Sequence, residues 1–395
     1  MPGALAGLRV LDISEGVAAP YCTKLLANFG AEVIKVEKPG SGDWSRQKGP
    51  FFHDEPGLEH SLLFAYLNTS KRSVTLDLHS TPGRQAFQKL STMSNVVVMS
   101  DSLRRLDELA GGDRESLRRT NPVLVATAVP FFNDAGPYAD FKATELNLYA
   151  LSGLLSMASG DKDGRRLKAG GYQAQYMAGI QACAMTLFGA YKARQSGVGS
   201  FIETSLLESC ARVLSSMQDH VPGTTNVRGP MIQEGAAWQA SDGFITIMLY
   251  YYQMEALGKL VGAPDLADDK SIGTEVNLSR SRHLWGPPLE SWLKTKTAAE
   301  AQQEGQDNHL LFTKVNNTRD IVESEHLNAR QFFHEVDHPV MGHAKYPGGP
   351  FELTSADRST SRPAPLLGEA NELVLGEWLG LNAEERALVS GHGSK

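Results

Sequence analysis

Short apolar segments alternate with helical segments through the first 130 residues, and this alternation limits the possible folds more than any other feature of the sequence. The expected helices in this part are residues 20–29 and 83–93. The expected strands are residues 9–13, 32–37, 73–78, 95–99 and 123–129. Strands that are almost continuously apolar and that alternate with helices are typical of a parallel sheet covered by helices. The sequence therefore predicts an α/β fold.

The rest of the chain is less regular. Helical segments are expected at residues 145–157 and 174–194, and a loop-rich passage follows at residues 222–245. The segments from there to about residue 325 form a candidate second domain. Strand character returns at residues 347–353, and residues 370–379 are expected to make a closing helix.

Composition excludes several classes of function. With 41% hydrophobic and 21% charged residues, the chain of 395 residues has the make-up of a globular protein. The net charge of −7 argues against a general nucleic-acid or membrane-surface role, which needs a basic face. No signal-peptide core opens the chain and no apolar stretch reaches the ~20 residues of a membrane helix. The three cysteines lie far apart, so neither a zinc site nor a disulfide framework is expected, and the cytoplasm is the expected location.

Two common nucleotide-binding patterns are missing. The turn after the first strand reads S-E-G-V-A-A-P and lacks G-x-G-x-x-G, whose glycines allow the backbone to approach a pyrophosphate. The sequence also contains no G-x-x-x-x-G-K-[ST]. We therefore expect neither a dinucleotide site nor a P-loop.

Six stretches, in order along nearly the whole chain, resemble the class III CoA-transferase family, which includes the carnitine CoA-transferase and α-methylacyl-CoA racemase branches. They include GLRVLDISEGVAAPYCTKLLANFGAEVIKVEKPGSGDWSR, LNTSKRSVTLDL, NPVLVATAVPFFNDAGPY, FIETSLLES, FFHEVDHPVMGHAKYPGGPFEL and RPAPLLGEAN. The resemblance implies a Rossmann-like large domain that contains both chain ends, a small inserted domain, and an interlocked dimer. We therefore expect a large domain from residues 1–222 and 331–395, and a small domain with its linkers at 223–330.

The resemblance also implies a site for coenzyme A, with acyl-CoA as substrate and no metal. CoA carries phosphates, so its site needs cations and backbone donors near a helix start. The residues at the matching positions are Val17, Ala18, Lys38, Lys71, Arg72 and Lys142. The alternative interpretation is that the lysines are solvated surface residues. Where the family reads E-N-F-x-P-G, this chain reads M-S-D-S-L-R, so either Arg104 and Arg105 serve a phosphate there or the groove is degenerate.

The catalytic position departs from the family pattern. In the family an aspartate carboxylate attacks the acyl-CoA thioester, and the matching residue here is Gln175, in G-G-Y-Q-A-Q-Y-M-A-G. An amide cannot form the acyl anhydride, because it is neutral and its lone pairs are delocalised. The histidine of the racemase branches is replaced by Thr144, which argues against racemisation. Glu145 remains as a general-base candidate, or as a carboxylate favoured by a helix N-terminus.

Three functions stay open at this point. The first is that the chain is the non-nucleophilic subunit of a heteromeric CoA-transferase, paired with a sister chain that carries the aspartate. Alternatively it is a homodimeric acyl-CoA enzyme with altered chemistry that uses Glu145, or an acyl-CoA-binding protein without catalysis. Aromatic residues of the presumed pocket, Phe131, Tyr138 and Tyr172 among them, are compatible with an aromatic acyl group or with ordinary core packing.

Overall fold

The computed structural model describes residues 3–157, 165–213, 237–269, 272–274, 278, 281–348, 353 and 362–391. Most of the loop-rich passage at 222–245 and most of the strand-like stretch at 347–353 lie outside these residues. The chain divides into two compact units, Met1–Thr225 with Gln331–Lys395, and Asn226–Arg330. The domain limits expected from the sequence, with a small domain at 223–330, stay a prediction.

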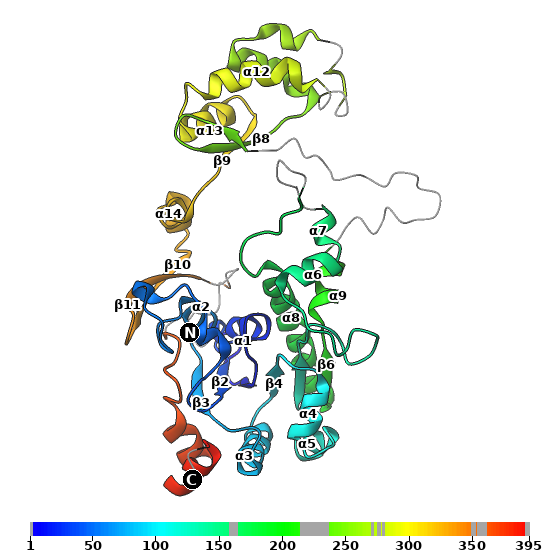
Figure 1. Cartoon of the computed structure of the whole chain (residues 1–395), viewed down its shortest axis with the longest axis vertical. Helices are drawn as coiled ribbons and strands as arrows, with labels where there is room; N and C mark the ends of the chain where they lie inside the picture. The colour runs from blue at the N-terminus through cyan, green and yellow to red at the C-terminus, as the bar shows by residue number, and fades with distance from the viewer. Residues whose placement is uncertain are drawn as a thin grey trace. The chain divides into compact units, whose positions relative to one another are not determined.

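A parallel six-stranded sheet forms the centre of the first unit and confirms the predicted α/β fold (Figure 1). Its order is β3-β2-β1-β4-β5-β6, and every neighbouring pair is parallel. The strands are β1 Arg9–Asp12, β2 Glu32–Glu37, β3 Arg72–Thr75, β4 Val96–Met99, β5 Val125–Ala128 and β6 Ser200–Glu203. β6 was not expected from the sequence. This order places a topological switch point between β1 and β4, where ligands bind outside the carboxyl ends of the strands.

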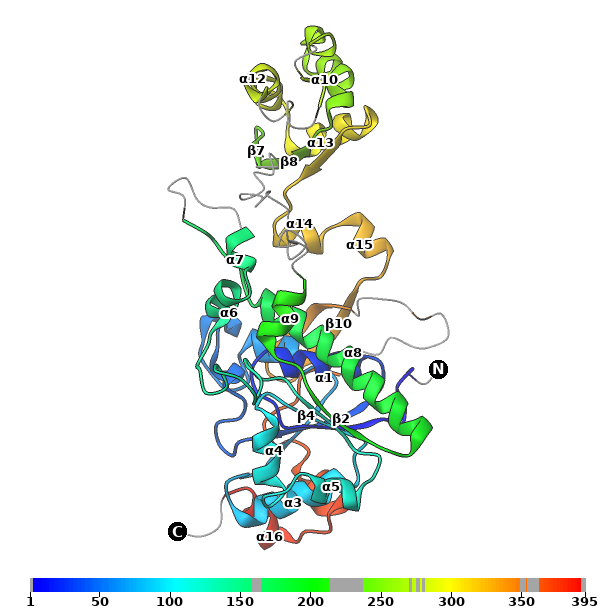
Figure 2. The same cartoon turned by 90° about the vertical axis from the view of Figure 1, so that its right-hand side faces the viewer.

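Alternate residues of the strands enter two separate cores. Val10, Val33 and Val98 pack with α1 Ala18–Asn28, α8 Gln173–Ser196 and α9 Leu206–Arg212 on one face. Leu11, Ile34 and Val97 pack on the other face, which Figure 2 shows below the sheet. That face is covered by α3 Thr81–Thr92, α4 Leu103–Leu109, α5 Glu115–Thr120, the π-helix η7 Glu372–Trp378 and α16 Ala383–Val389. Burial on both faces explains why the strands are continuously apolar.

Shorter elements complete the first unit. The helix expected at 145–157 is broken at Gly153, whose φ of +88° belongs to the left-handed region that glycine adopts readily, giving two helices. The two helices are α6 Glu145–Leu151 and α7 Leu154–Met157. The other short elements of the first unit are α2 Leu62–Leu67, η1 Trp44–Gln47, η2 Phe52–Asp54 and the antiparallel pair β10 Phe333–His338 and β11 Gly342–Pro347. The last pair ends where the sequence predicted a strand to begin.

The second unit has its own core. Trp238, Ile245 and Phe312 project from a three-stranded antiparallel sheet onto the surrounding helices. The strands are β7 Trp238–Gln239, β8 Phe244–Met248 and β9 Leu311–Lys314. The helices are η4 Tyr251–Gln253, α10 Met254–Val261, η5 Pro264–Ala267, α12 Arg282–Leu293, α13 Ala298–Asp307, α14 Thr318–Val322 and α15 Glu325–Ala329.

Candidate functional site

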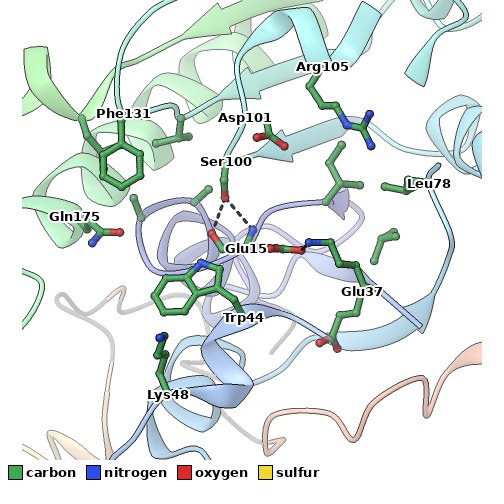
Figure 3. A pocket seen from close by; sticks show the side chains of 18 of the residues that line it. Glu15, Glu37, Trp44, Lys48, Leu78, Ser100, Asp101, Arg105, Phe131 and Gln175 are labelled. Carbon is green, nitrogen blue, oxygen red and sulfur yellow. Dashed lines mark hydrogen bonds and ion pairs between the residues drawn. The ribbon is translucent and has the colours of Figure 1, made fainter. Parts of the chain in front are cut away.

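A cavity of about 940 Å³ opens at the carboxyl edge of the parallel sheet (Figure 3). It is lined by residues that follow β1, β2, β3, β4 and β5, so five strand ends contribute to one site. A side-chain bridge joins the segments that follow β1 and β4, the two paired strands of the switch point. The Ser100 hydroxyl donates to the Glu15 carbonyl at 2.6 Å and accepts from the Glu15 N–H at 2.8 Å. The cavity therefore lies where the strand order predicts a ligand.

The turn before α1 is held tightly against Trp44. Gly16 has a φ of +91°, and a Cβ there would lie 2.8 Å from the indole nitrogen, so only glycine fits. The Gly16 N–H donates to Asp43 Oδ1 at 3.0 Å. Ala18 begins α1 and lines the cavity, whereas Val17, the residue before the helix, is buried beside it and does not. The turn thus offers backbone and small side chains to a ligand.

Cations lie along one part of the cavity wall. Lys38 lines it, is more than half exposed, and forms an ion pair of 2.8 Å with Glu15. Arg105 lines it as well and pairs with Glu108 at 2.6 Å. Three further basic groups line the cavity and were not expected from the sequence, namely Lys48, His79 and Lys168. His79 could have been found, because it closely follows β3 and the carboxyl ends of parallel strands meet at one edge.

Gln175 and Glu145 lie together on the wall of the cavity. Both are nearly buried, at 7% and 6% exposed. The Gln175 amide donates to Glu145 Oε2 at 3.3 Å, and the Ala174 N–H donates to Glu145 Oε1 at 2.7 Å. Glu145 therefore satisfies a free N–H in the first turn of α8 and orients the glutamine, so both carboxylate oxygens are engaged.

The K-R pair at 71–72 does not reach this cavity, which corrects the expectation for both residues. Lys71 is fully buried and donates to Asp12 at 3.0 Å, to the Pro20 carbonyl at 2.9 Å and to Asn68 at 2.8 Å. Three hydrogen bonds use all three of its N–H donors, so Lys71 is a core residue. Arg72 begins β3 and lies at the amino end of the strand, away from the carboxyl edge.

Arg104 and Lys142 are also outside the lining of the cavity. Arg104 is exposed and pairs with Asp134 at 2.7 Å and with Asp140 at 3.4 Å. Lys142 is exposed, and its neighbours Ala143 and Thr144 line the cavity in its place. At the end of the 99–104 loop, the arginine that faces the cavity is therefore Arg105 rather than Arg104.

The aromatic residues separate into two groups. Phe131 and Tyr172 line the cavity, together with Trp44. Tyr138 and Tyr176 do not: Tyr138 packs on Phe132 with ring centroids 5.8 Å apart, and Tyr176 packs on Tyr21 at 4.8 Å. Only the first group faces the cavity.

A buried ionic network supports the turn beneath the cavity. Lys35 forms ion pairs with Asp43 at 2.8 Å and with Asp12 at 4.0 Å, and it donates to the Ser14 carbonyl at 2.9 Å. Burial by itself raises the pKa of Asp12, but Lys35, Lys71 and hydrogen bonds from Ser14 and Thr23 outweigh burial and lower that pKa to about 2. The network fixes the turn before α1 through Asp43, which binds the Gly16 N–H.

Acid is expected to weaken the fold through Asp12. Because its folded pKa of about 2 lies below the ordinary value of 3.8, its stabilisation is complete above pH 4 and is lost as the pH falls from about 4 to about 2. That difference corresponds to about 2 kcal/mol. Urea unfolding at pH 5 and pH 2.5 measures the loss, and Asp12→Asn should flatten the dependence. An equal dependence in the variant would contradict the assignment.

Two other features, a metal site and a membrane-spanning helix, were sought among the described residues. No group of three or more histidine, cysteine, aspartate or glutamate side chains that could hold a metal ion occurs among them. None of the helices in the described part of the chain is long and apolar enough to cross a membrane.

Comparison with known proteins shows which family the chain matches. A model described as CoA-transferase family III matches residues 5–371. The formyl-CoA:oxalate CoA-transferase of Streptomyces avermitilis is 30% identical, over 100% of both chains. The succinyl-CoA:(R)-benzylsuccinate CoA-transferase subunit BbsE of Thauera aromatica is 30% identical over 93% of each chain. A crystal structure of a CaiB/BaiF family protein from Brucella suis has the same fold, with a TM-score of 0.83 at 24% identity over 95% of this chain and 100% of that one.

Proposed function

The chain belongs to CoA-transferase family III, a family that acts on acyl-CoA thioesters, and from that premise we propose that it is the subunit without a nucleophile in a heteromeric CoA-transferase. The observation that carries the proposal is Gln175, a neutral amide at the wall of the cavity where the family resemblance places a nucleophilic aspartate. A related chain, BbsE, is named as one subunit of a CoA-transferase, which supports a heteromer.

Glu145 is a poor substitute for the missing nucleophile. Its two oxygens accept hydrogen bonds from Ala174 and Gln175, and it is nearly buried. An attack on a thioester through Oε2 would require that oxygen to release the Gln175 amide, while the Ala174 N–H holds Oε1 and fixes the carboxylate in place. We therefore assign Glu145 as a positioning residue for Gln175 and for the start of α8.

The cavity can hold the CoA thioester itself. Its volume of about 940 Å³ suits an extended ligand larger than a typical metabolite. We assign Lys38, Arg105 and Lys48 to the phosphates, because charge-assisted hydrogen bonds from cations are the strong ones. The thioester end would then lie near Gln175, whose amide can donate its second N–H to the thioester carbonyl. In this role the chain binds and orients an acyl-CoA.

Replacing Arg105 is expected to weaken CoA binding, whereas replacing its neighbour Arg104 is not. Arg105 lines the cavity and Arg104 does not. Loss of one hydrogen bond to a charged group costs about 1.5–3 kcal/mol, so Arg105→Ala should raise the Kd of CoA about tenfold or more. Isothermal titration of CoA into both variants tests this. A larger loss for Arg104→Ala would contradict the placement of the phosphates.

The heteromer is tested by purification from the native source with the intact mass of the assembly. A sister chain of similar size, carrying an aspartate at the matching position, is the expected result. The interlocked dimer that the family resemblance implies favours a heteromer, because a partner of the same topology can replace one protomer. A homodimer as the sole species would reject the proposal.

Glu145 supports a second candidate, a homodimeric enzyme with altered acyl-CoA chemistry, because this carboxylate lines the same cavity. That candidate predicts turnover of an acyl-CoA by the chain alone, with loss of activity in Glu145→Gln. A chain that binds acyl-CoA and shows no turnover with or without partners would instead be a binding protein.

A further inference from the structure

A second, smaller cavity of about 210 Å³ lies at the opposite edge of the parallel sheet. Its wall comes from the end of α1 and the residues after it, from the starts of β2 and β3, and from the return segment near the end of the chain. The lining residues are Ala27, Gly30, Ala31, Glu32, Ser70, Arg72 and Arg362. None of them lines the large cavity, which is built from the carboxyl ends of the strands.

Two arginines and one carboxylate, Glu32, line this cavity, and Glu369 acts on Arg362 from outside the lining. Arg72 Nε is buried and has no hydrogen-bond partner among the described residues. Its nearest carboxylate, Glu32 Oε1, is 3.9 Å away, and the other oxygen of Glu32 already accepts from Arg9 Nε at 3.0 Å. A buried guanidinium N–H without an acceptor is costly, so the site is incomplete as the chain alone builds it.

Arg362 is fixed in position beside Arg72. Its Nη2 donates to the Ser70 carbonyl at 3.0 Å, and its own carbonyl accepts from the Ser70 N–H at 3.1 Å. Burial and then the neighbouring Arg72 lower the pKa of Arg362, which is the effect of two cations facing each other. The backbone contacts with Ser70 thus hold the Arg362 guanidinium near Arg72 against their repulsion.

We propose that this cavity binds a small tetrahedral oxyanion of the phosphate or sulfate type. A doubly charged oxyanion would neutralise both arginines, accept from the orphaned Arg72 Nε and occupy a polar space of the right size. The volume is far below that of the large cavity and excludes a whole CoA molecule. The ligand is either the free ion or the phosphoryl group of a small monoester.

Titration calorimetry and thermal unfolding of the full chain with inorganic phosphate test the proposal, with chloride at equal ionic strength as the reference. A saturable heat and a saturable rise in Tm are expected for phosphate only. Arg362→Gln and Arg72→Gln should each weaken phosphate binding at least tenfold. Arg119→Gln, at the exposed end of α5 and outside both cavities, should leave it unchanged. If glycerol phosphate binds more tightly than phosphate, the natural ligand is a monoester; the reverse order indicates the free ion.

Three results would overturn the proposal. One is the absence of a saturable response to phosphate, and another is an undiminished response in Arg362→Gln. The third is loss of the response in Arg105→Ala, which would assign the phosphate to the large cavity. If Arg362→Gln fails to fold, Arg72→Lys provides the test, because it keeps the charge and removes the Nε donor: weaker binding supports the site and equal binding rejects it.

Discussion

Gln175→Asp is expected to convert a chain that forms no covalent intermediate into one that carries an acyl group. The introduced carboxylate would lie in the first turn of α8, where the helix dipole favours a negative charge. One carboxylate oxygen attacks the thioester carbonyl carbon, the carbon–sulfur bond breaks, and CoA leaves as the thiolate. The intact mass should rise by one acyl group per chain. Hydroxylamine should release that group by attacking either carbonyl of the anhydride, which leaves residue 175 as the aspartate or as its hydroxamate.

Gln175→Asn is the matched control for this experiment, since it has the length of aspartate and remains a neutral amide. It should give no adduct, like the unmodified chain. The panel should consist of acyl-CoA esters already shown to bind. Absence of an adduct in Gln175→Asp with every bound ester would mean that the thioester does not lie beside residue 175, and the assignment of the cavity would be wrong.

Lys35→Met is expected to give the largest loss of stability from a single side chain. Lys35 is completely buried and holds Asp43 at 2.8 Å and Asp12 at 4.0 Å. Removing one partner of a buried ion pair leaves the other charges unbalanced and costs about 3–5 kcal/mol. The same change moves the turn before α1, because Asp43 binds the Gly16 N–H, so CoA binding should weaken as well.

Lys38→Met, three positions further along the chain, is the control for Lys35→Met. Lys38 is more than half exposed and its pair with Glu15 is screened by water, so the expected cost is about 1 kcal/mol or less. The midpoint of the first unfolding transition in urea compares the two variants. Equal midpoints would contradict the view that the network under the cavity stabilises the large unit.

The strands and their direction were predictable because a buried parallel strand has a composition that solvent-exposed segments do not share. Residues just after parallel strands meet at one edge, and Lys38, which the family resemblance had indicated, lies there. β6 was missed, since S-F-I-E is short and only partly buried, and its pairing with β5 depends on contacts 75 positions apart.

Side-chain direction was the main limit on predicting the site. Lys71 and Arg72 are adjacent in sequence, yet one enters the core and the other faces the opposite edge of the sheet. Arg104 and Arg105 likewise separate, because successive residues on a helix point about 100° apart. Family motifs place such a pair correctly in sequence, but only the packing of the strands and helices decides which member faces the cavity.

Mapping the acyl group on the purified native assembly is the most direct test of the central claim. The assembly would be incubated with an acyl-CoA that binds, quenched with hydroxylamine, and each chain analysed by peptide mass spectrometry. We predict a hydroxamate on an aspartate of a sister chain and none on this chain. A modified residue on this chain, at Glu145 or elsewhere in the cavity, would contradict the claim that it contributes binding without the nucleophile.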